Sequence, residues 1–495
     1  MARFRLLMGI GVLGVVRLCS ADILAVPGDF ATIQGALNAA VAGDTIEVAS
    51  GSYSEKLVFP SSGQAGAPIV LTAAPGPRPV IDGTGVNGAN MVFINSRSFV
   101  TIEGFEIVNN LGVSDGSGIR IVGNGTDIVV RNNLIHEIRG IHAMGITVYG
   151  TDPQPISNLL IENNQIFDCD PAQSEALTLN GNVDGFEILG NLVRDVNSIG
   201  IDMIGGETDI QPNSTLVARN GVVRGNTVLR ANANYEGGFG GGIYVDGGRD
   251  IVIENNWVAE SDLGLEIGAE NPGLTTRNVI VRNNVFSRNE RAGIVFGGFE
   301  QAVGRVESCE FRGNTLWQNN TVGETGQGTY FVGGGIAEIW VQWASDNLIE
   351  NNIVVAGPEN IVVGSFDPGS SVNNQLDYNL YHGPNPANAE YSLNDQFFTG
   401  LAAWQAQTSQ DPNSFVADPE LLNPQDDDFH VSARSPARDA GDPAFLPEPD
   451  ETDLDGEARL VGDAVDIGVD ESGPGAIFSD GFESGDTSAW SGVTN

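Results

Sequence analysis

The sequence predicts an all-β protein whose chain winds into a parallel β-helix solenoid of about ten coils. The first observation is a short phrase that recurs along most of the 495 residues, for example IVIENNWV ending at Val258. Nine copies centre on an asparagine at intervals of 27 to 38 residues, and a repeat near thirty residues is typical of a solenoid. The second observation is an alternation of apolar and polar residues, rich in β-branched side chains, which predicts short strands. The asparagines are Asn133, Asn164, Asn191, Asn226, Asn256, Asn284, Asn314, Asn352 and Asn379.

A second strand phrase follows each asparagine, as in GITVYG at Gly145 and GLEIGA at Gly264. Each coil therefore supplies short strands separated by glycine and asparagine corners, and equivalent strands stack at about 4.8 Å. Asparagine tolerates left-handed backbone torsions and can hydrogen-bond to its copy in the next coil. We expect the asparagine column to shape one corner and to hold the coils in register.

The N-terminal end carries an export signal and a cap. Residues 1–21 contain two early arginines, an apolar run from Leu6 to Val16 and Ala21 at the expected cleavage site, which is the pattern of a secretory signal peptide. This predicts a secreted or cell-surface protein. Residues 22–95 are expected to form an N-terminal cap and the first coils, because an apolar helical stripe can cover the open strand edge. That stripe is Ile33, Ala36, Leu37 and Ala40.

The rest of the chain divides by its pattern. The main β-helix is expected over residues 96–382, where both phrases recur. Residues 383–415 are expected to form a linker with a short helix, residues 416–475 an acidic C-terminal module, and residues 476–495 a C-terminal tail.

Composition excludes several classes of partner. Acidic residues number 64 against 23 basic ones, the net charge is −41, and Lys56 is the only lysine. No basic stripe can displace phosphate counterions, so nucleic acid is not expected as a partner. No other run approaches the ~18 apolar residues of a membrane span, and the strong net charge favours a monomer. Cys169 and Cys309 fall several coils apart, so we expect two separate buried thiols.

The chain resembles the right-handed parallel β-helix proteins of the pectate-lyase-like superfamily, a group of exported bacterial proteins. The repeated phrases carry this resemblance, together with the front end FATIQ at 30–34 and AGDTIEV at 42–48. The acidic module resembles the variable-anchor type C-terminal module of such proteins, through SPARDAG at 435–441 and DLDG at 453–456. The resemblance implies a right-handed solenoid and an extracellular polysaccharide as the partner.

Chemistry is expected on the outward column of the second strand phrase. Asp202 and Asp246 fall on adjacent coils, offset by two residues, which puts their carboxylates roughly 6 to 9 Å apart. That range suits the paired carboxylates of glycoside hydrolysis, with Glu266 as a third candidate. The alternative is that these acidic residues form only a solvated face. The outward column is Arg120, Thr147, Thr178, Asp202, Tyr244, Glu266 and Val295.

Substrate binding and elimination chemistry involve further residues of this face. The candidate substrate-binding residues are Arg120, Tyr149, Asn180, Tyr244 and Trp340, because aromatic faces stack on sugar rings and polar groups orient them. A lyase needs a base, a cation against the uronate and a proton donor, and His142, Tyr149 and Arg120 form the alternative set for those roles. The alginate-lyase-like enzymes that the chain resembles use a lysine base, whereas the only lysine of this chain, Lys56, belongs to the predicted N-terminal cap.

The sequence assigns no metal centre and no certain cofactor. Ca²⁺ is the one ion left open, because Asp453-Leu454-Asp455-Gly456 matches the start of a Ca²⁺ loop without its remainder. The prediction is a protein that binds an extracellular polysaccharide, with cleavage by hydrolysis or elimination left open. The alternative is a non-catalytic surface or adhesion protein that uses the solenoid as a rigid scaffold.

Overall fold

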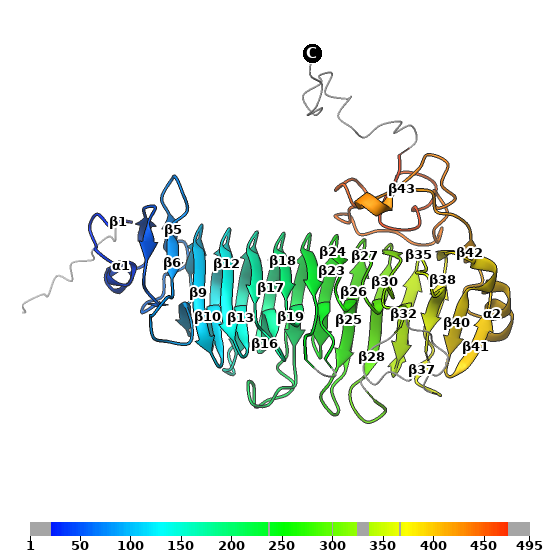
Figure 1. Cartoon of the computed structure of the whole chain (residues 1–495), viewed down its shortest axis with the longest axis horizontal. Helices are drawn as coiled ribbons and strands as arrows, with labels where there is room; N and C mark the ends of the chain where they lie inside the picture. Colours follow the sequence, from blue (N-terminus) through cyan, green and yellow to red (C-terminus); the bar gives the residue numbers. More distant parts are fainter. Residues whose placement is uncertain (1–20, 236–237, 299, 324–335, 366–367, 474–495) are drawn as a thin grey trace, which may run out of the picture.

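The computed structural model describes residues 21–235, 238–298, 300–323, 336–365 and 368–473. Within these ranges the chain winds into a long solenoid, with α1 (Ile33–Ala39) at one end and α2 (Leu401–Thr408) at the other (Figure 1). The predicted parallel β-helix is confirmed. The predicted signal peptide, apart from Ala21, and the predicted tail at 476–495 lie outside the described residues.

Sheet 1 carries the second strand phrase and runs the length of the solenoid. Its 13 strands exceed the ten coils expected, because its first and last strands lack the asparagine phrase. In order they are β4 (Leu57–Val58), β7 (Val92–Asn95), β10 (Gly116–Val122), β13 (Ala143–Gly150), β16 (Glu175–Gly181), β19 (Ile199–Ile204), β22 (Gly241–Asp246), β25 (Leu263–Ala269), β28 (Ala292–Gly298), β32 (Ala337–Gln342), β36 (Ile361–Gly364), β40 (Glu390–Leu393) and β41 (Gln396–Thr399). All neighbours pair in parallel except β40 and β41.

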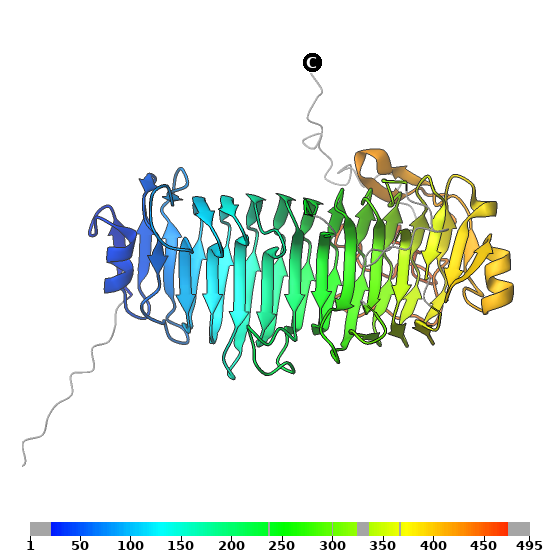
Figure 2. The ribbon, with the colours of Figure 1, turned by 60° about the horizontal axis from the view of Figure 1, so that its bottom comes forward.

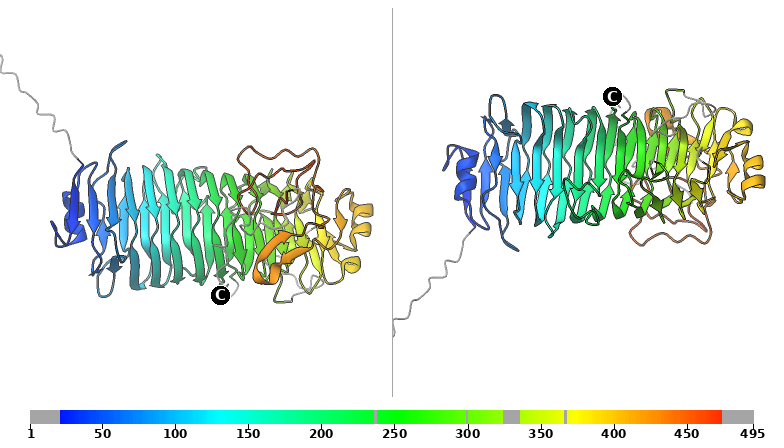
Figure 3. Two further views of the ribbon diagram at one scale, coloured as in Figure 1. Left: turned by 90° about the horizontal axis from the view of Figure 1, so that it is seen from above. Right: turned by 90° about the horizontal axis from the view of Figure 1, so that it is seen from below.

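Sheets 2 and 3 complete each coil, and both are parallel stacks (Figures 2 and 3). Sheet 2 comprises β1 (Ile23–Val26), β2 (Thr45–Val48), β5 (Ile69–Ala73), β8 (Val100–Glu103), β11 (Gly125–Arg131), β14 (Ile156–Glu162), β17 (Val183–Leu189), β20 (Arg219–Arg224), β23 (Arg249–Glu254), β26 (Thr276–Arg282), β29 (Val306–Glu307), β33 (Ala344–Ser345) and β37 (Ser371–Val372), with β30 (Glu310–Arg312), β34 (Leu348–Glu350) and β38 (Gln375–Asp377) stacked beyond β26. Sheet 3 comprises β3 (Ser52–Tyr53), β6 (Val80–Asp82), β9 (Glu106–Val113), β12 (Leu134–Gly140), β15 (Gln165–Cys169), β18 (Leu192–Val196), β21 (Thr227–Ala231), β24 (Trp257–Ala259), β27 (Val285–Ser287), β31 (Thr315–Trp317), β35 (Ile353–Val355), β39 (Leu380–His382) and β42 (Phe415–Val416).

The core lies inside the three sheets and follows the alternation of each strand. In β22, for example, Ile243 and Val245 point inward and are fully buried, while Tyr244 and Asp246 point to the other face. Cys169 and Cys309 are buried free thiols, as expected. Because apolar side chains stack on their copies from coil to coil, one continuous core cluster extends from Val26 to Trp404.

The asparagine column forms the corner between sheets 2 and 3, as predicted. Each Nδ2 donates to the Oδ1 of the next copy at 2.9 to 3.0 Å, in an unbroken ladder from Asn133 to Asn379. The left-handed torsion falls on the residue just before each ladder position, as at Asn132 and Asn255, and not on the ladder asparagine itself. The ladder asparagines therefore provide buried hydrogen bonds, and their neighbours make the turn.

Breaking the ladder at its centre is expected to destabilise the solenoid. Asn256→Ala removes the acceptor for the backbone N–H and the Nδ2 of Asn226, at 2.8 and 2.9 Å. Leaving buried donors unpaired costs about 2 to 4 kcal/mol in total. Chemical denaturation checks this, with the exposed Asn388→Ala as the control; equal midpoints for the two variants would contradict the structural role of the ladder.

Both ends of the solenoid are closed. Thr32 caps α1 by accepting a hydrogen bond from the Gly35 N–H at 3.0 Å, and Ile33, Ala36 and Leu37 of that helix are buried. Residues 383–415, expected as a linker with a short helix, add β40 and β41 to sheet 1 and place α2 over the last coil. The fully buried Trp404 donates from Nε1 to Asp411 at 2.7 Å, so this segment is an end cap.

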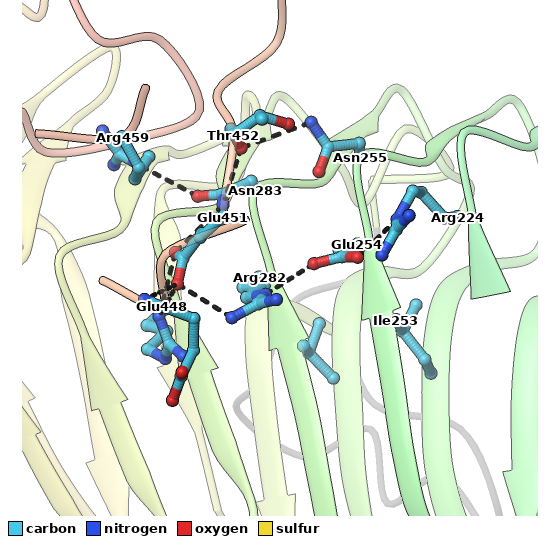
Figure 4. Close-up of polar contacts among 12 residues, drawn as sticks. Arg224, Ile253, Glu254, Asn255, Arg282, Asn283, Glu448, Glu451, Thr452 and Arg459 are labelled. Atoms are coloured by element: carbon cyan, nitrogen blue, oxygen red, sulfur yellow. Dashed lines mark hydrogen bonds and ion pairs between the residues drawn. The ribbon is translucent and has the colours of Figure 1, made fainter. Parts of the chain in front are cut away.

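The acidic module, including β43 (Leu421–Asn423) and β44 (Asp428–Val431), lies against the solenoid over β24 to β38 (Figure 1). Its apolar side chains, such as Phe429 and Ile467, pack on Trp317, Val355 and their neighbours. Figure 4 shows the polar part of the contact, in which Glu451 reaches Arg282 and Asn283 at 2.8 and 3.1 Å. The module is therefore joined to the solenoid by a buried interface.

Candidate active site

A pocket lies on the outer face of sheet 1, over β16 to β32. Its volume is about 400 Å³. Among its described lining residues there are six carboxylates and no lysine, arginine or histidine. The carboxylates are Glu175, Asp202, Glu207, Asp246, Glu266 and Glu270.

Strand register explains how three predicted catalytic residues meet here. Asp202 of β19 aligns with Tyr244 of β22, which aligns with Glu266 of β25. Val295 and Trp340 continue the same row on β28 and β32. Asp246 lies two residues beyond Tyr244, so it is diagonal to both Asp202 and Glu266. The structure thus brings Asp202, Asp246, Glu266, Tyr244 and Trp340 to one pocket.

Asp202 is a deeply buried lining residue of the pocket. Its side chain is 1% exposed, and its Oδ1 has no hydrogen-bond partner among the described residues. Burial raises the pKa of Asp202 well above its usual range, and the nearby Glu175 and Asp246 raise it further. Because the charged form lacks solvation and has acidic neighbours, the neutral acid is favoured at this position.

The pKa values of Asp246 and Glu266 are raised for the same reasons, but the two side chains have different partners. Burial, with Glu270 next, raises the pKa of Asp246 well above its usual range, while its Oδ1 accepts the backbone N–H of Glu270 at 2.8 Å. Burial, Glu270 and Asp246 raise the pKa of Glu266. The backbone hydrogen bond favours the ionised form, so Asp246 is the better stabilised carboxylate of the pair with Asp202.

Three of the six lining carboxylates, Glu175, Glu207 and Glu270, are not among the residues predicted from the sequence. Burial and the neighbouring Glu207 raise the pKa of Glu175 to about 8. Glu207 accepts from the Asn180 Nδ2 at 2.7 Å, and Glu270 accepts from the Tyr244 hydroxyl at 3.2 Å. Glu175 opens its strand ahead of the outward column, and the other two lie in loops after β19 and β25. The sequence signal for Glu207 is an insertion at Gly205 to Leu216, which lengthens the interval between Asn191 and Asn226 to 35 residues.

A loop between β21 and β22 supplies an aromatic side of the pocket through Tyr235 and Phe239. Asp262 holds both ends of this loop, since its Oδ2 accepts the N–H groups of Ala233 and Gly240 at 2.8 and 2.7 Å. The Arg291 guanidinium packs over the Phe239 ring at 4.4 Å and is not among the lining residues. A second insertion, at residues 321–335, lengthens the interval between Asn314 and Asn352 to 38 residues, and it lies outside the described residues from 324 onward.

The alternative lyase set lies beside this pocket and not in it. Arg120 and Tyr149 are on β10 and β13, with the guanidinium 5.5 Å from the tyrosine ring centre. Arg120 is paired with Asp115 through both carboxylate oxygens. His142 contacts the Ser174 hydroxyl at 3.2 Å. None of the three lines the pocket, and the cation of Arg120 is already neutralised.

Asp453 does not offer free ligands for Ca²⁺. Its Oδ1 accepts the N–H groups of Asp455 and Glu457 at 3.0 and 2.8 Å, and its Oδ2 accepts that of Glu471 at 3.3 Å. Close by, His430, Asp455 and Asp470 each bring one ligand atom within 4.8 Å of the others. In the described part of the chain this is the one group of three with such spacing, so no three pocket carboxylates converge as closely.

Known proteins match this architecture. Residues 25–197 match the family described as "Pel9A-like, right handed beta helix region", and residues 176–354 match "Right handed beta helix region". The uncharacterized protein YwoF of Bacillus subtilis (strain 168) is 31% identical over 426 residues, which covers 83% of this chain and 88% of that protein.

Two solved structures are similar to this chain. Pectate lyase Pel9A aligns over 92% of this chain and 97% of its own, with a TM-score of 0.47 and 16% identity. The family 28 exopolygalacturonase of Yersinia enterocolitica aligns over 73% and 75%, with a TM-score of 0.52 and 12% identity. At these identities the likeness concerns the fold. No helix among the described residues is long and apolar enough to cross a membrane.

Proposed function

This chain belongs to the right-handed parallel β-helix proteins of the pectate-lyase-like superfamily, and we propose that it is an exported enzyme that binds an extracellular polysaccharide in the acidic pocket and hydrolyses it there. The observation that carries the proposal is the pairing of Asp202 with Asp246. Asp202 is buried, its Oδ1 has no hydrogen-bond partner among the described residues, and it lies diagonally across from a carboxylate that accepts a backbone N–H.

The two carboxyl groups suit the two roles of glycoside hydrolysis. Asp202, held as the neutral acid, donates its proton to the glycosidic oxygen as the bond to the anomeric carbon breaks. Asp246 accepts a proton from the water that attacks that carbon. A diagonal pair on adjacent parallel strands has Cα atoms about 8 Å apart. Because both side chains leave the same face of sheet 1, we expect a similar separation between the two carboxyl groups, which is in the range that leaves room for this water. Inversion at the anomeric carbon is therefore expected.

The remaining lining groups suit a sugar ligand. Trp340, Tyr244, Tyr235 and Phe239 give the pocket aromatic surfaces, and such surfaces stack on the apolar faces of sugar rings. Glu266 is two strands from Asp202, and in this proposal it is the third carboxylate, which orients the substrate or the water.

Hydrolysis is favoured over elimination by what lines the pocket. Elimination requires a base beside the uronate and a cation to neutralise its carboxylate. The described lining residues include no lysine, arginine or histidine, while Lys56 donates to the Gly88 carbonyl and to the Asn110 Oδ1 in the first coils. A polyuronate would also meet six carboxylates.

The assignment is tested by product chemistry. Protein from residue 22 is incubated with neutral, amino-sugar and uronic-acid polysaccharides, with and without Ca²⁺, while new reducing ends and the ultraviolet absorbance of unsaturated uronates are followed together. Reducing ends without absorbance are expected. Absorbance that rises together with reducing ends would show elimination. No change in either signal with any of the polysaccharides would favour a binding or scaffold role.

The pH dependence of the reaction follows from Asp202. Because burial and acidic neighbours raise its pKa, the protonated acid persists toward neutral pH, and kcat/KM is expected to fall as pH rises through that pKa. A pH–rate profile from about pH 4 to pH 9 checks this. A rate that climbs steadily to the alkaline end would contradict the general-acid role.

A further inference from the structure

We propose that the polysaccharide taken by the acidic pocket carries protonated amino groups, as a polymer of glucosamine or galactosamine units does. This inference rests on the proposed function of the same site, and it adds the charge of the substrate. The starting point is that six carboxylates line one pocket without a lysine, arginine or histidine among the described lining residues. Charges of one sign at this density require a cation when they ionise.

Asp202 independently indicates that a donor is missing from the pocket. It is 1% exposed, and its Oδ1 is an acceptor with no hydrogen-bond partner among the described residues. Buried acceptors normally have a donor, and an ammonium group has three N–H bonds and no acceptor. A sugar ammonium beside Asp202 would supply both the hydrogen bond and the positive charge.

The arrangement of the carboxylates fits a charged polymer better than a single metal ion. Ca²⁺ takes six to eight oxygens at about 2.3 to 2.6 Å, so its ligands must converge on one point. No three pocket carboxylates in the described part of the chain bring one oxygen each within 4.8 Å of the others. Glu175, Asp202, Asp246 and Glu266 instead lie on four successive strands, spread over about 14 Å.

Electrostatics at longer range favours the same ligand. The net charge of −41 attracts a polycation and repels a polyuronate at long range. The aromatic side chains of the pocket then serve the sugar rings between the charges. Burial and acidic neighbours raise the pKa values of Glu175 and Asp246, so binding of a cationic chain is expected to release protons from these two groups, while Asp202 keeps the proton that it donates in the reaction.

Isothermal titration calorimetry with defined oligosaccharides tests the proposal. The ligands are a six-unit glucosamine oligomer, the same oligomer fully N-acetylated, and a six-unit oligogalacturonate with and without Ca²⁺. We expect the glucosamine oligomer to bind at least about tenfold more tightly than its acetylated form, with affinity falling as salt is added. Titration in buffers of different ionisation enthalpy should reveal proton release.

Two variants link the effect to the pocket. Glu175→Gln combined with Glu207→Gln removes two lining charges outside the proposed catalytic pair and should weaken the glucosamine oligomer about tenfold, leaving the acetylated form unchanged. Glu187→Gln, an exposed change on sheet 2, is the matched control and should leave both affinities unchanged.

The remaining outcomes separate the two proposals. Equal or tighter binding of the acetylated oligomer, or no binding of the glucosamine oligomer, overturns the amino-sugar assignment. Tight binding of oligogalacturonate only with Ca²⁺ overturns it in favour of a metal-bridged uronate. If the glucosamine oligomer binds but is never cleaved, the proposed hydrolysis fails and the amino-sugar assignment stands. If neutral glycans are cleaved without preference for amino groups, the proposed hydrolysis stands and the amino-sugar assignment fails.

Discussion

Asp202→Asn is expected to abolish polysaccharide cleavage while the protein stays folded. Loss of a general acid lowers the rate by about 10²- to 10⁴-fold, because the amide cannot donate the proton that the leaving oxygen needs. Burial and acidic neighbours raise the pKa of Asp202, so the folded protein binds more protons here than the unfolded chain. Ionisation at higher pH therefore costs stability, and the neutral amide should leave Tm unchanged or raise it at pH about 8.

The measurement is the initial rate on a substrate cleaved by the wild type, alongside a thermal melt of the same preparation. Asp246→Asn should lose activity similarly, since it removes the group that activates water. Glu187→Gln on the outer face of sheet 2 controls for the loss of one charge and should retain full activity. Substantial residual activity in Asp202→Asn would remove this residue from the mechanism.

Glu451→Ala is expected to be the most destabilising single change at the module interface. Glu451 is 4% exposed and contacts Arg282 at 2.8 Å and Arg312 at 2.8 and 2.9 Å. Removing one partner of a buried ion pair leaves the others uncompensated and costs about 3 to 5 kcal/mol. Unfolding by denaturant checks the value, with the exposed Glu457→Ala in the same module as the control; matching curves for the two variants would show that the network contributes little.

The same network should make the interface acid-sensitive. Burial alone would raise the pKa of Glu451, but Arg312 and Arg282, together with hydrogen bonds from Arg312 and Asn283, hold it below its usual value near 4.5. A depressed folded-state pKa contributes stability that is complete above the unfolded pKa and is lost as pH falls through the folded one. The difference in stability between wild type and Glu451→Ala should therefore shrink below about pH 4.5. A difference that stays constant down to pH 3 would contradict this.

Much of the fold could be predicted because the repeat encodes it locally. Alternating side chains such as Ile251, Val252 and Ile253 specify a strand, and the asparagine column marks one corner in nine coils. Residues 383–415 give no local sign of β40 and β41, because these strands lack the repeat and β40 is held by its pairing with β36 of the preceding coil. The buried module interface could not be predicted from the sequence either, because Glu451 and Arg282, which form an ion pair in it, are 169 residues apart in the chain.

The candidate site was predictable only where it follows the strand period. Asp202, Tyr244 and Glu266 share one outward row, and register alone places them together. Arg120 belongs to the same row but lies outside the pocket, because loops, and not strands, decide which part of the row is enclosed. Glu207 and Glu270 come from those loops, whose paths no periodicity encodes.

The most direct test of hydrolysis at the Asp202 and Asp246 pair is cleavage in ¹⁸O-labelled water, with the anomeric configuration of the first product followed by NMR. Hydrolysis at this pair predicts one labelled oxygen at each new reducing end, an inverted configuration, and loss of both signals in Asp202→Asn. An unsaturated product without label, or a labelled product formed equally well by Asp202→Asn, would contradict it.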